Sequence, residues 1–246
     1  MLISGYRTSL AALILLAAAL TGCSDGKKTP SPSAKASSET TTATATPEPT
    51  YAAEKAKSAL FDVKDLGKKW TEEGLPDAFK EGKVRGCSDS KIALVGSPRV
   101  WAQKFGAPRF RFEGVNYAQL VSVHLTADQA TASMDRIREA LAKCPASKKI
   151  PQKKLPDDRF AYQHDDTWKM TEGDVLGWRH VRGFEKSVYP PSLSRINVFY
   201  YSIDYAQRGN IVFSSIYWQR VKPKDSGDPI AEKATEILTE QLQRFG

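Results

Sequence analysis

Two neighbouring segments near the end of the chain, residues 195–205 and 210–221, constrain its fold most strongly. In both, apolar or aromatic side chains occupy both faces of an extended chain. The first segment carries Ile196, Val198 and Tyr200 on one face and Phe199, Tyr201 and Ile203 on the other. A strand with one face in water alternates apolar with polar residues, so these segments are predicted to be central strands covered on both sides. Between them, Ala206–Gly209 is predicted to form a hairpin loop, in which glycine can adopt positive φ.

Two further segments have the period of an amphipathic helix. Behind Thr126, which begins a capping box with Gln129, one face carries Ala130, Met134, Ile137, Leu141 and Cys144. After Pro229, which suits a first helical position, one face carries Ile230, Ala234, Ile237, Gln241 and Phe245. We also expect a strand at 117–125, a helical turn at 97–104 and a solvated polar turn at 164–166. The predicted fold is α+β: a single domain over residues 51–246, with helices packed on a twisted antiparallel sheet.

Residues 1–22 have the pattern of a lipoprotein signal peptide. Arg7 precedes eleven apolar residues, Leu10–Leu20, whereas a membrane-spanning helix needs about twenty. The run ends in Leu20-Thr21-Gly22-Cys23, which resembles the lipobox of bacterial lipoproteins. The resemblance implies cleavage before Cys23, lipidation of its sulfur, and anchoring of the protein at the extracytoplasmic face of the cell membrane. The alternative is an ordinary signal peptide that happens to precede a cysteine.

A disordered tether is predicted to follow, so that residues 23–50 comprise the lipidated cysteine and a spacer. Ser, Thr, Pro and Ala make up 20 of the 27 residues from Ser24 to Thr50, and Leu, Ile, Val and aromatic residues are missing there. Such a composition cannot form a core. A random coil of this length holds the domain about 30 Å from the lipid.

Cys87 and Cys144 are the only cysteines in the predicted domain. An even pair in an exported domain most often forms a disulfide, and Cys144 lies on the apolar face of its helix. The alternative is a reactive thiol. A Cys-X-X-Cys motif is missing, and the carboxyl end of a helix raises the pKa of a thiol, so we predict a structural disulfide.

The sequence nominates no catalytic residue, no metal site and no cofactor. Nucleophile-elbow, Walker, dinucleotide-binding and zinc-protease motifs are missing. A pair of carboxylates distant in sequence could still hydrolyse a glycosidic bond. The chain has a formal net charge of +8. Its basic residues form three clusters: Lys148, Lys149, Lys153 and Lys154 in one loop, Arg109 and Arg111 around Phe110, and Arg220, Lys222 and Lys224. Outside the cytoplasm an anionic envelope polymer or a lipid headgroup fits such clusters better than nucleic acid.

Aromatic residues are concentrated in the second half of the chain and could line a pocket. The residues proposed for ligand binding are Trp168, Trp178, Tyr200 and Trp218. Since aromatic residues also favour strands intrinsically, the alternative is that they belong to the core.

Several features together resemble the PknH-type extracellular sensor domain of actinobacteria. They are residues 60–66 (LFDVKDL) with Trp70 close behind, Cys87, the helix ending in Cys144, and the Arg208-Gly209-Asn210 turn. The resemblance covers about residues 55–245 and implies an antiparallel sheet flanked by helices, a ligand-binding cleft and no enzymatic activity. Such domains often carry two disulfides, whereas this chain can form one. A PsbP-like lipoprotein domain has a similar architecture.

The expected function is therefore that of a membrane-anchored extracytoplasmic lipoprotein with a non-catalytic, sensor-like domain that binds a ligand or partner. The alternatives are an envelope hydrolase that uses carboxylates and an assembly factor for another envelope protein. The latter would need an exposed apolar patch.

Overall fold

The computed structural model describes residues 48–107, 114–155 and 160–246. The chain divides into two compact units, Met1–Ala45 and Thr46–Gly246, and the described residues belong to the second. Predictions about the signal peptide, Cys23, most of the tether, Arg109 and Arg111 therefore concern residues outside the described part.

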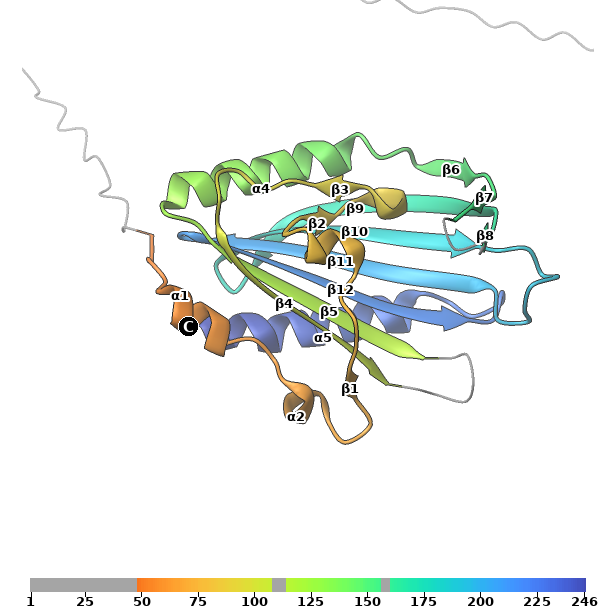
Figure 1. The fold of residues 1–246 in the computed structure, drawn as a ribbon, viewed down its shortest axis with the longest axis horizontal. Coiled ribbons are helices and arrows are strands. Elements are labelled where there is room, and N and C mark those ends of the chain that lie inside the picture. Colours follow the sequence, from red (N-terminus) through yellow and green to blue (C-terminus); the bar gives the residue numbers. More distant parts are fainter. Residues whose placement is uncertain (1–47, 108–113, 156–159) are drawn as a thin grey trace, which may run out of the picture. The chain divides into compact units, whose positions relative to one another are not determined.

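The predicted α+β fold is confirmed (Figure 1). One eight-stranded sheet, antiparallel throughout, has the strand order β1-β4-β5-β12-β11-β10-β9-β6. In that order the strands are β1 (Thr71–Glu72), β4 (Arg99–Ala107), β5 (Val115–Val123), β12 (Ile211–Val221), β11 (Val198–Arg208), β10 (Trp178–Val188), β9 (His164–Val175) and β6 (Ser147–Ile150). Two short ribbons pair β2 (Val84–Arg85) with β3 (Lys91–Ile92), and β7 (Lys153–Lys154) with β8 (Phe160–Ala161).

Helices cover both faces of the sheet, as the two-sided strands require. On one face lies α4 (Ala127–Ala142), and on the other lie α1 (Ala53–Ser58) and α5 (Asp228–Phe245). The remaining helical turns are α2 (Val63–Leu66), α3 (Asp77–Lys80) and the 3₁₀ turn η1 (Cys87–Asp89). The helix patterns are confirmed: Met134 and Ile137 of α4 and Leu238 of α5 are fully buried.

The two faces differ in how far their helices extend. Helix α5 runs along the whole face, since its end packs with Phe213 while its start packs with Tyr200. Helix α4 packs near the β11–β12 hairpin, with Ile203 and Val212. The segment Leu75–Leu94, which we call the crossing segment, continues this cover and passes in front of the strands in Figure 1. Beyond it, no helix of the described residues covers the far ends of β9 to β12 on the α4 face (Figure 1).

Two local predictions were wrong. Residues 97–104 do not form a helical turn: Arg99–Ala107 is strand β4, which pairs with β5 along its whole length. The strand is favoured over a helical turn because it places alternate residues of β4, such as Trp101 and Phe105, in the core on the α5 side. Residues 164–166 are not a solvated turn but the start of β9, and Asp166 is 3% exposed.

The hairpin between the central strands is tighter than predicted. Strand β11 continues to Arg208, so that Gly209 and Asn210 alone form the loop, with φ of Gly209 at +54°. The carbonyl of Pro49 lies where a Cβ on Gly209 would be, which also requires glycine. The amide of Asn210 holds the entering chain, accepting from the Tyr51 N–H at 2.7 Å and donating to the Tyr51 carbonyl at 3.2 Å.

A buried glutamine joins α5 to the segment after α1. Gln241 is fully buried; its Nε2 donates to the Ala59 carbonyl at 2.8 Å and its Oε1 accepts from the Phe61 N–H at 3.1 Å. We predict that Gln241→Leu lowers the free energy of unfolding by about 1–3 kcal/mol, because it leaves the Ala59 carbonyl buried without a donor. Urea denaturation checks this, with the exposed Gln243→Leu on the same helix as the matched control. Equal stability of the two variants would contradict the assignment.

Candidate functional site

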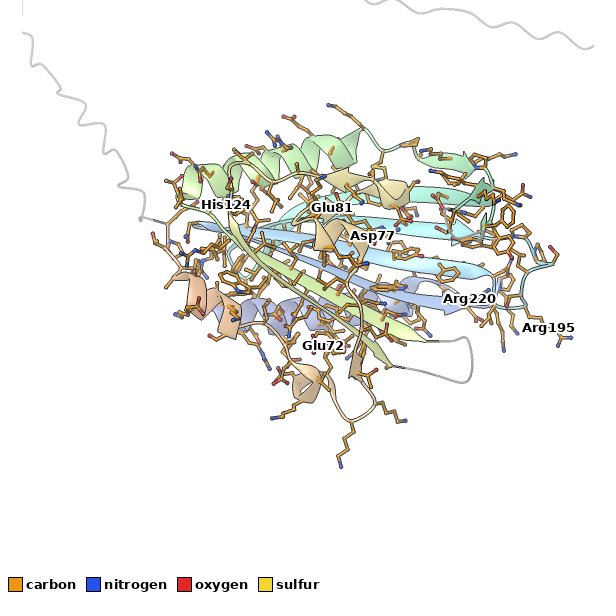
Figure 2. The ribbon with its side chains drawn as sticks, in the orientation of Figure 1. Glu72, Asp77, Glu81, His124, Arg195 and Arg220 are labelled. Atoms are coloured by element: carbon orange, nitrogen blue, oxygen red, sulfur yellow. A yellow bond between two sulfur atoms is a disulfide. The ribbon has the colours of Figure 1, made fainter. Side chains whose placement is uncertain are left out.

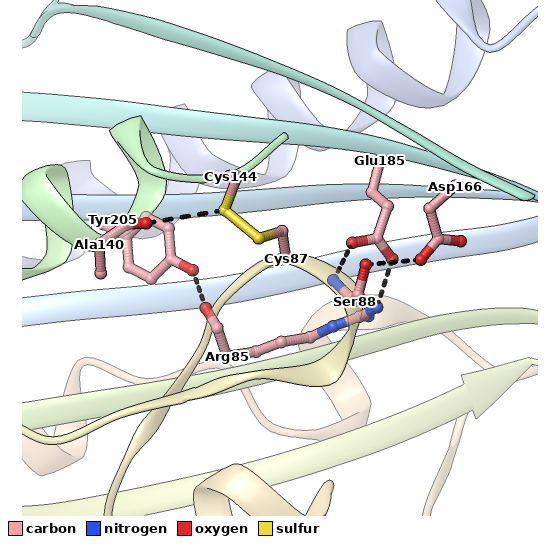
Figure 3. Close-up of a disulfide and its surroundings, with 8 residues drawn as sticks. All are labelled: Arg85, Cys87, Ser88, Ala140, Cys144, Asp166, Glu185 and Tyr205. Atoms are coloured by element: carbon pink, nitrogen blue, oxygen red, sulfur yellow. Dashed lines mark hydrogen bonds and ion pairs between the residues drawn. A yellow bond between two sulfur atoms is a disulfide. The ribbon is translucent and has the colours of Figure 1, made fainter. Parts of the chain in front are cut away.

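A disulfide fixes the crossing segment to the end of α4, and a cluster of buried charges fixes it to the sheet (Figure 3). The disulfide between Cys87 and Cys144 is present and joins η1 to the residues after α4. It closes a sequence separation of 57 residues, for which the chain-entropy model gives about 4 kcal/mol of stabilisation. The η1 turn is thereby held close to β9 and β10.

Four residues, Arg85, Ser88, Asp166 and Glu185, make up what we call the carboxylate cluster. Arg85 Nη2 donates to Glu185 Oε1 at 2.7 Å, and the Ser88 N–H donates to Glu185 Oε2 at 2.6 Å. Ser88 Oγ donates to Asp166 Oδ2 at 2.6 Å, and Ser187 Oγ donates to Asp166 Oδ1 at 2.7 Å. Each carboxylate oxygen therefore has a donor, which is what buried charges require.

The backbone of η1 is strained to reach these acceptors. Ser88 and Asp89 have φ of +48° and +59°, in the left-handed region that non-glycine residues rarely adopt. In this conformation Ser88 presents both its N–H and its hydroxyl to the sheet. The disulfide at the adjacent Cys87 and the two carboxylates therefore hold the strained turn together.

Burial and charge act in opposite directions on the ionisable groups here. Burial raises the pKa of Glu185, and the positive charge of Arg85 offsets part of that rise. Burial lowers the pKa of Arg85, but the charges of Glu185 and Asp89 raise it by more, so the guanidinium stays ionised. Burial raises the pKa of Tyr189 to about 12, so at neutral pH its phenol is uncharged and can donate a hydrogen bond.

Beside the carboxylate cluster, on the same face, half-buried aromatic side chains cross the strands. This aromatic row consists of Tyr189, Phe199, Tyr201 and Trp218. Phe199 and Tyr201 are nearly parallel, with ring centroids 6.1 Å apart, and Tyr201 and Trp218 follow at 6.3 Å. At the other end, His164 stacks on Tyr189 at 4.5 Å.

Cations lie against the aromatic row. The Arg85 guanidinium carbon is 4.0 Å from the Tyr201 centroid, that of Arg220 is 5.1 Å from the Phe199 centroid, and Lys104 Nζ is 5.4 Å from the Trp218 ring. Each such contact contributes about 0.5–2 kcal/mol, more where water is excluded. The row thus combines flat apolar surfaces with positive charge.

A hollow lies at each end of the aromatic row. One, of about 440 Å³, is lined by Lys149, Ile150, Pro151, Gln163, His164, Asp165, Val188, Tyr189, Pro190 and Pro191. The other, of about 230 Å³, is lined by Gly74, Leu75, Pro76, Arg85, Asp89, Lys104, Tyr201, Ile216 and Trp218. A ligand that follows the row would reach both.

The structure does not bring the four residues proposed for ligand binding together. Trp168 and Trp178, 7% and 1% exposed, are core residues in two different clusters. Tyr200 lies on the α5 face, where it lines a separate hollow of about 230 Å³ beside the start of α5. Trp218 alone belongs to the aromatic row.

The residues proposed for ligand binding did not include the other aromatic residues of the row or the carboxylate cluster. Tyr201 is one position from Tyr200 and therefore points to the opposite face. Arg85 and Glu185 are 100 positions apart in the chain, and Ser88 is 97 positions from Glu185 and 78 from Asp166. Such contacts leave no local pattern in a sequence.

The described residues offer no group of three metal-ligating side chains that could hold an ion. None of the helices in the described part of the chain is both long and apolar enough to cross a membrane.

Comparison with known proteins gives weak likenesses of fold. No protein-family model matches the chain, and no curated protein is detectably similar in sequence. The extracellular domain of PknH from Mycobacterium tuberculosis superposes with a TM-score of 0.47 and 11% identity, covering 81% of this chain and 98% of that domain. PA94 from Pseudomonas aeruginosa, a protein of unknown function, superposes with a TM-score of 0.29 and 12% identity, covering 68% of this chain and 94% of that protein. At these values neither likeness carries an argument about function.

The buried ion pair can be tested by a double-mutant cycle. We predict that Arg85→Met lowers the free energy of unfolding by about 3–5 kcal/mol, because it leaves Glu185 charged and buried without its cation. The double variant Arg85→Met/Glu185→Met should be clearly more stable than Arg85→Met, since no charge is then stranded. Urea denaturation of the wild type, the two single variants and the double variant measures this, and simple additivity of the losses of Arg85→Met and Glu185→Met would refute the pairing.

Proposed function

We propose that this chain is a membrane-anchored extracytoplasmic protein whose domain binds a ligand on the aromatic row without catalysing a reaction. The observation that carries the proposal is the aromatic row itself, which is half-buried and lies at the edge of the crossing segment, where Tyr201 and Trp218 line a hollow with Arg85. Aromatic side chains that stay partly accessible to water and have cations beside them are typical of binding sites. The lipobox-like sequence and the disulfide support an extracytoplasmic setting.

The carboxylate cluster supports binding over hydrolysis. Asp166 and Glu185, the buried carboxylates beside the row, are 3% and 2% exposed, while Asp89 and Asp165 line different hollows, one at each end of the row. Their oxygens are already occupied by Ser88, Ser187 and Arg85. A glycosidase needs two carboxyl groups that face the scissile bond from either side. In this arrangement Glu185 instead holds Arg85 against Tyr201, and Asp166 holds Ser88 and Ser187.

Cys23→Ser tests the anchor. We predict that the wild-type protein fractionates with membranes and carries fatty acid, while Cys23→Ser is released into the soluble fraction, because the acylated sulfur is lost. Ser33→Ala, in the same tether, should stay with the membranes. Retention of Cys23→Ser in the membrane fraction would contradict the anchor.

Trp218→Ala tests the binding surface. Loss of a central aromatic contact should weaken binding of an envelope polysaccharide fraction by about tenfold or more. The control is Trp101→Ala, which removes a half-buried tryptophan from the α5 face. Binding is measured by co-sedimentation of the soluble Cys23→Ser chain. An unchanged affinity of Trp218→Ala, or an equal loss with Trp101→Ala, would exclude the aromatic row as the binding surface.

A further inference from the structure

Arg220 is a half-buried cation without a carboxylate. It lies on β12 opposite Phe199 of β11, and its guanidinium rests over that ring. Its Nε is buried, and no described residue accepts a hydrogen bond from it. Within the described part of the chain no ion pair involves Arg220 either.

Most other arginines with a partly or fully buried side chain contact a carboxylate, whereas Arg208 donates to the Gly246 carbonyl at 2.8 Å. Arg85 meets Glu185 at 2.7 Å, and the remaining contacts, each at 2.6 Å, are Arg179 to Asp135, Arg182 to Asp204 and Arg244 to Asp65. Burying a cation without an anion beside it is unfavourable, so a buried arginine is normally paired with a carboxylate. Arg220, at the border of the proposed binding surface, therefore has no carboxylate partner among the described residues.

A second basic side chain lies at the same end of the sheet as Arg220. Figure 2 shows Arg195 at the same end of the sheet, and this side chain is exposed. Phe199, over which its guanidinium lies, belongs to the aromatic row. Guanidinium groups bind carboxylate and phosphate through two parallel N–H bonds, which a lysine cannot reproduce.

The surface is also long. From His164 on β9 to Lys104 on β4 it crosses five interstrand spacings, which at about 4.8 Å each give a track of roughly 24 Å. Its length and its hollow at either end fit a chain-like ligand better than a compact one.

From these observations we infer that Arg220 binds an acidic group, a carboxylate or phosphate, carried by a polysaccharide that lies along the aromatic row. This inference rests on the proposed function and names its ligand class. Aromatic rings of the row stack on the apolar faces of sugar rings, while Arg220 fixes the position of the acidic substituent. An extended acidic peptide fits less well, because peptides bind sheets through free edge backbone groups, and those of β10, β11 and β12 are already paired.

The test uses the full chain carrying Cys23→Ser, so that a lipid anchor does not contribute. The probes are an oligogalacturonate and its methyl ester, which share a sugar backbone and differ in charge. Isothermal titration should show that the acid binds the chain more tightly than the ester by about tenfold to a hundredfold. Arg220→Gln should remove this preference without altering ester binding, and Arg220→Lys should restore only part of it.

Arg195→Gln is the matched control, because it removes the same charge from an exposed position at the same end of the sheet. It should leave the preference within about twofold of the starting chain. Thermal unfolding of Arg220→Gln monitors folding, and ester binding provides a second check that the surface is intact.

Each other outcome overturns the inference. Equal binding of acid and ester, or an acid preference that survives in Arg220→Gln, excludes Arg220 as the acid-binding group while leaving the aromatic row as a binding surface. Binding of phosphatidylglycerol vesicles but of neither oligosaccharide would identify a lipid headgroup as the ligand instead. Binding of none of these probes would exclude the acidic ligand class, and the Trp218→Ala experiment then decides the proposed function separately.

Discussion

The ion pair between Arg85 and Glu185 is the interaction on which the candidate site depends. It joins the crossing segment to the middle of the sheet, and both side chains are almost completely buried. The same arginine lies over Tyr201, and its carbonyl accepts a hydrogen bond from the Tyr205 hydroxyl. Together with the adjacent disulfide, these contacts fix the position of the crossing segment on the sheet. Tyr201 and Trp218 lie at the edge of this segment, where they line a hollow with Arg85.

The unequal cover of the two faces explains why aromatic residues of the same strand have different roles. On the α5 face, Tyr200 and Tyr217 are buried beneath the start of the helix. On the α4 face, Tyr201 and Trp218 lie in the same strands but beyond the helix that covers Ile203 and Val212. A side chain's distance from the end of its covering layer, and not its residue type, decides whether it belongs to the core or to the surface.

The sequence predicted the parts of the fold that have a local period. The stripes of α4 and α5 and the two-sided strands β11 and β12 are strong patterns, and all four elements are where they were expected. Strand β9 was missed because it lies near an edge of the sheet, where Lys169, Glu172 and Asp174 are exposed and break the apolar alternation. The site itself needs the register of distant strands and the path of the crossing segment. Neither is encoded in a short window, so the choice of Tyr200 over Tyr201 could not be made from sequence.

The central claim is that the aromatic row faces solvent in the complete chain. Hydroxyl-radical footprinting of the purified full-length protein measures this directly, with each tryptophan as its own reporter. The account predicts rapid oxidation of Trp218 and strong protection of the core residues Trp168 and Trp178. Protection of Trp218 equal to that of Trp178 would mean that another part of the chain covers the row, and would contradict the account.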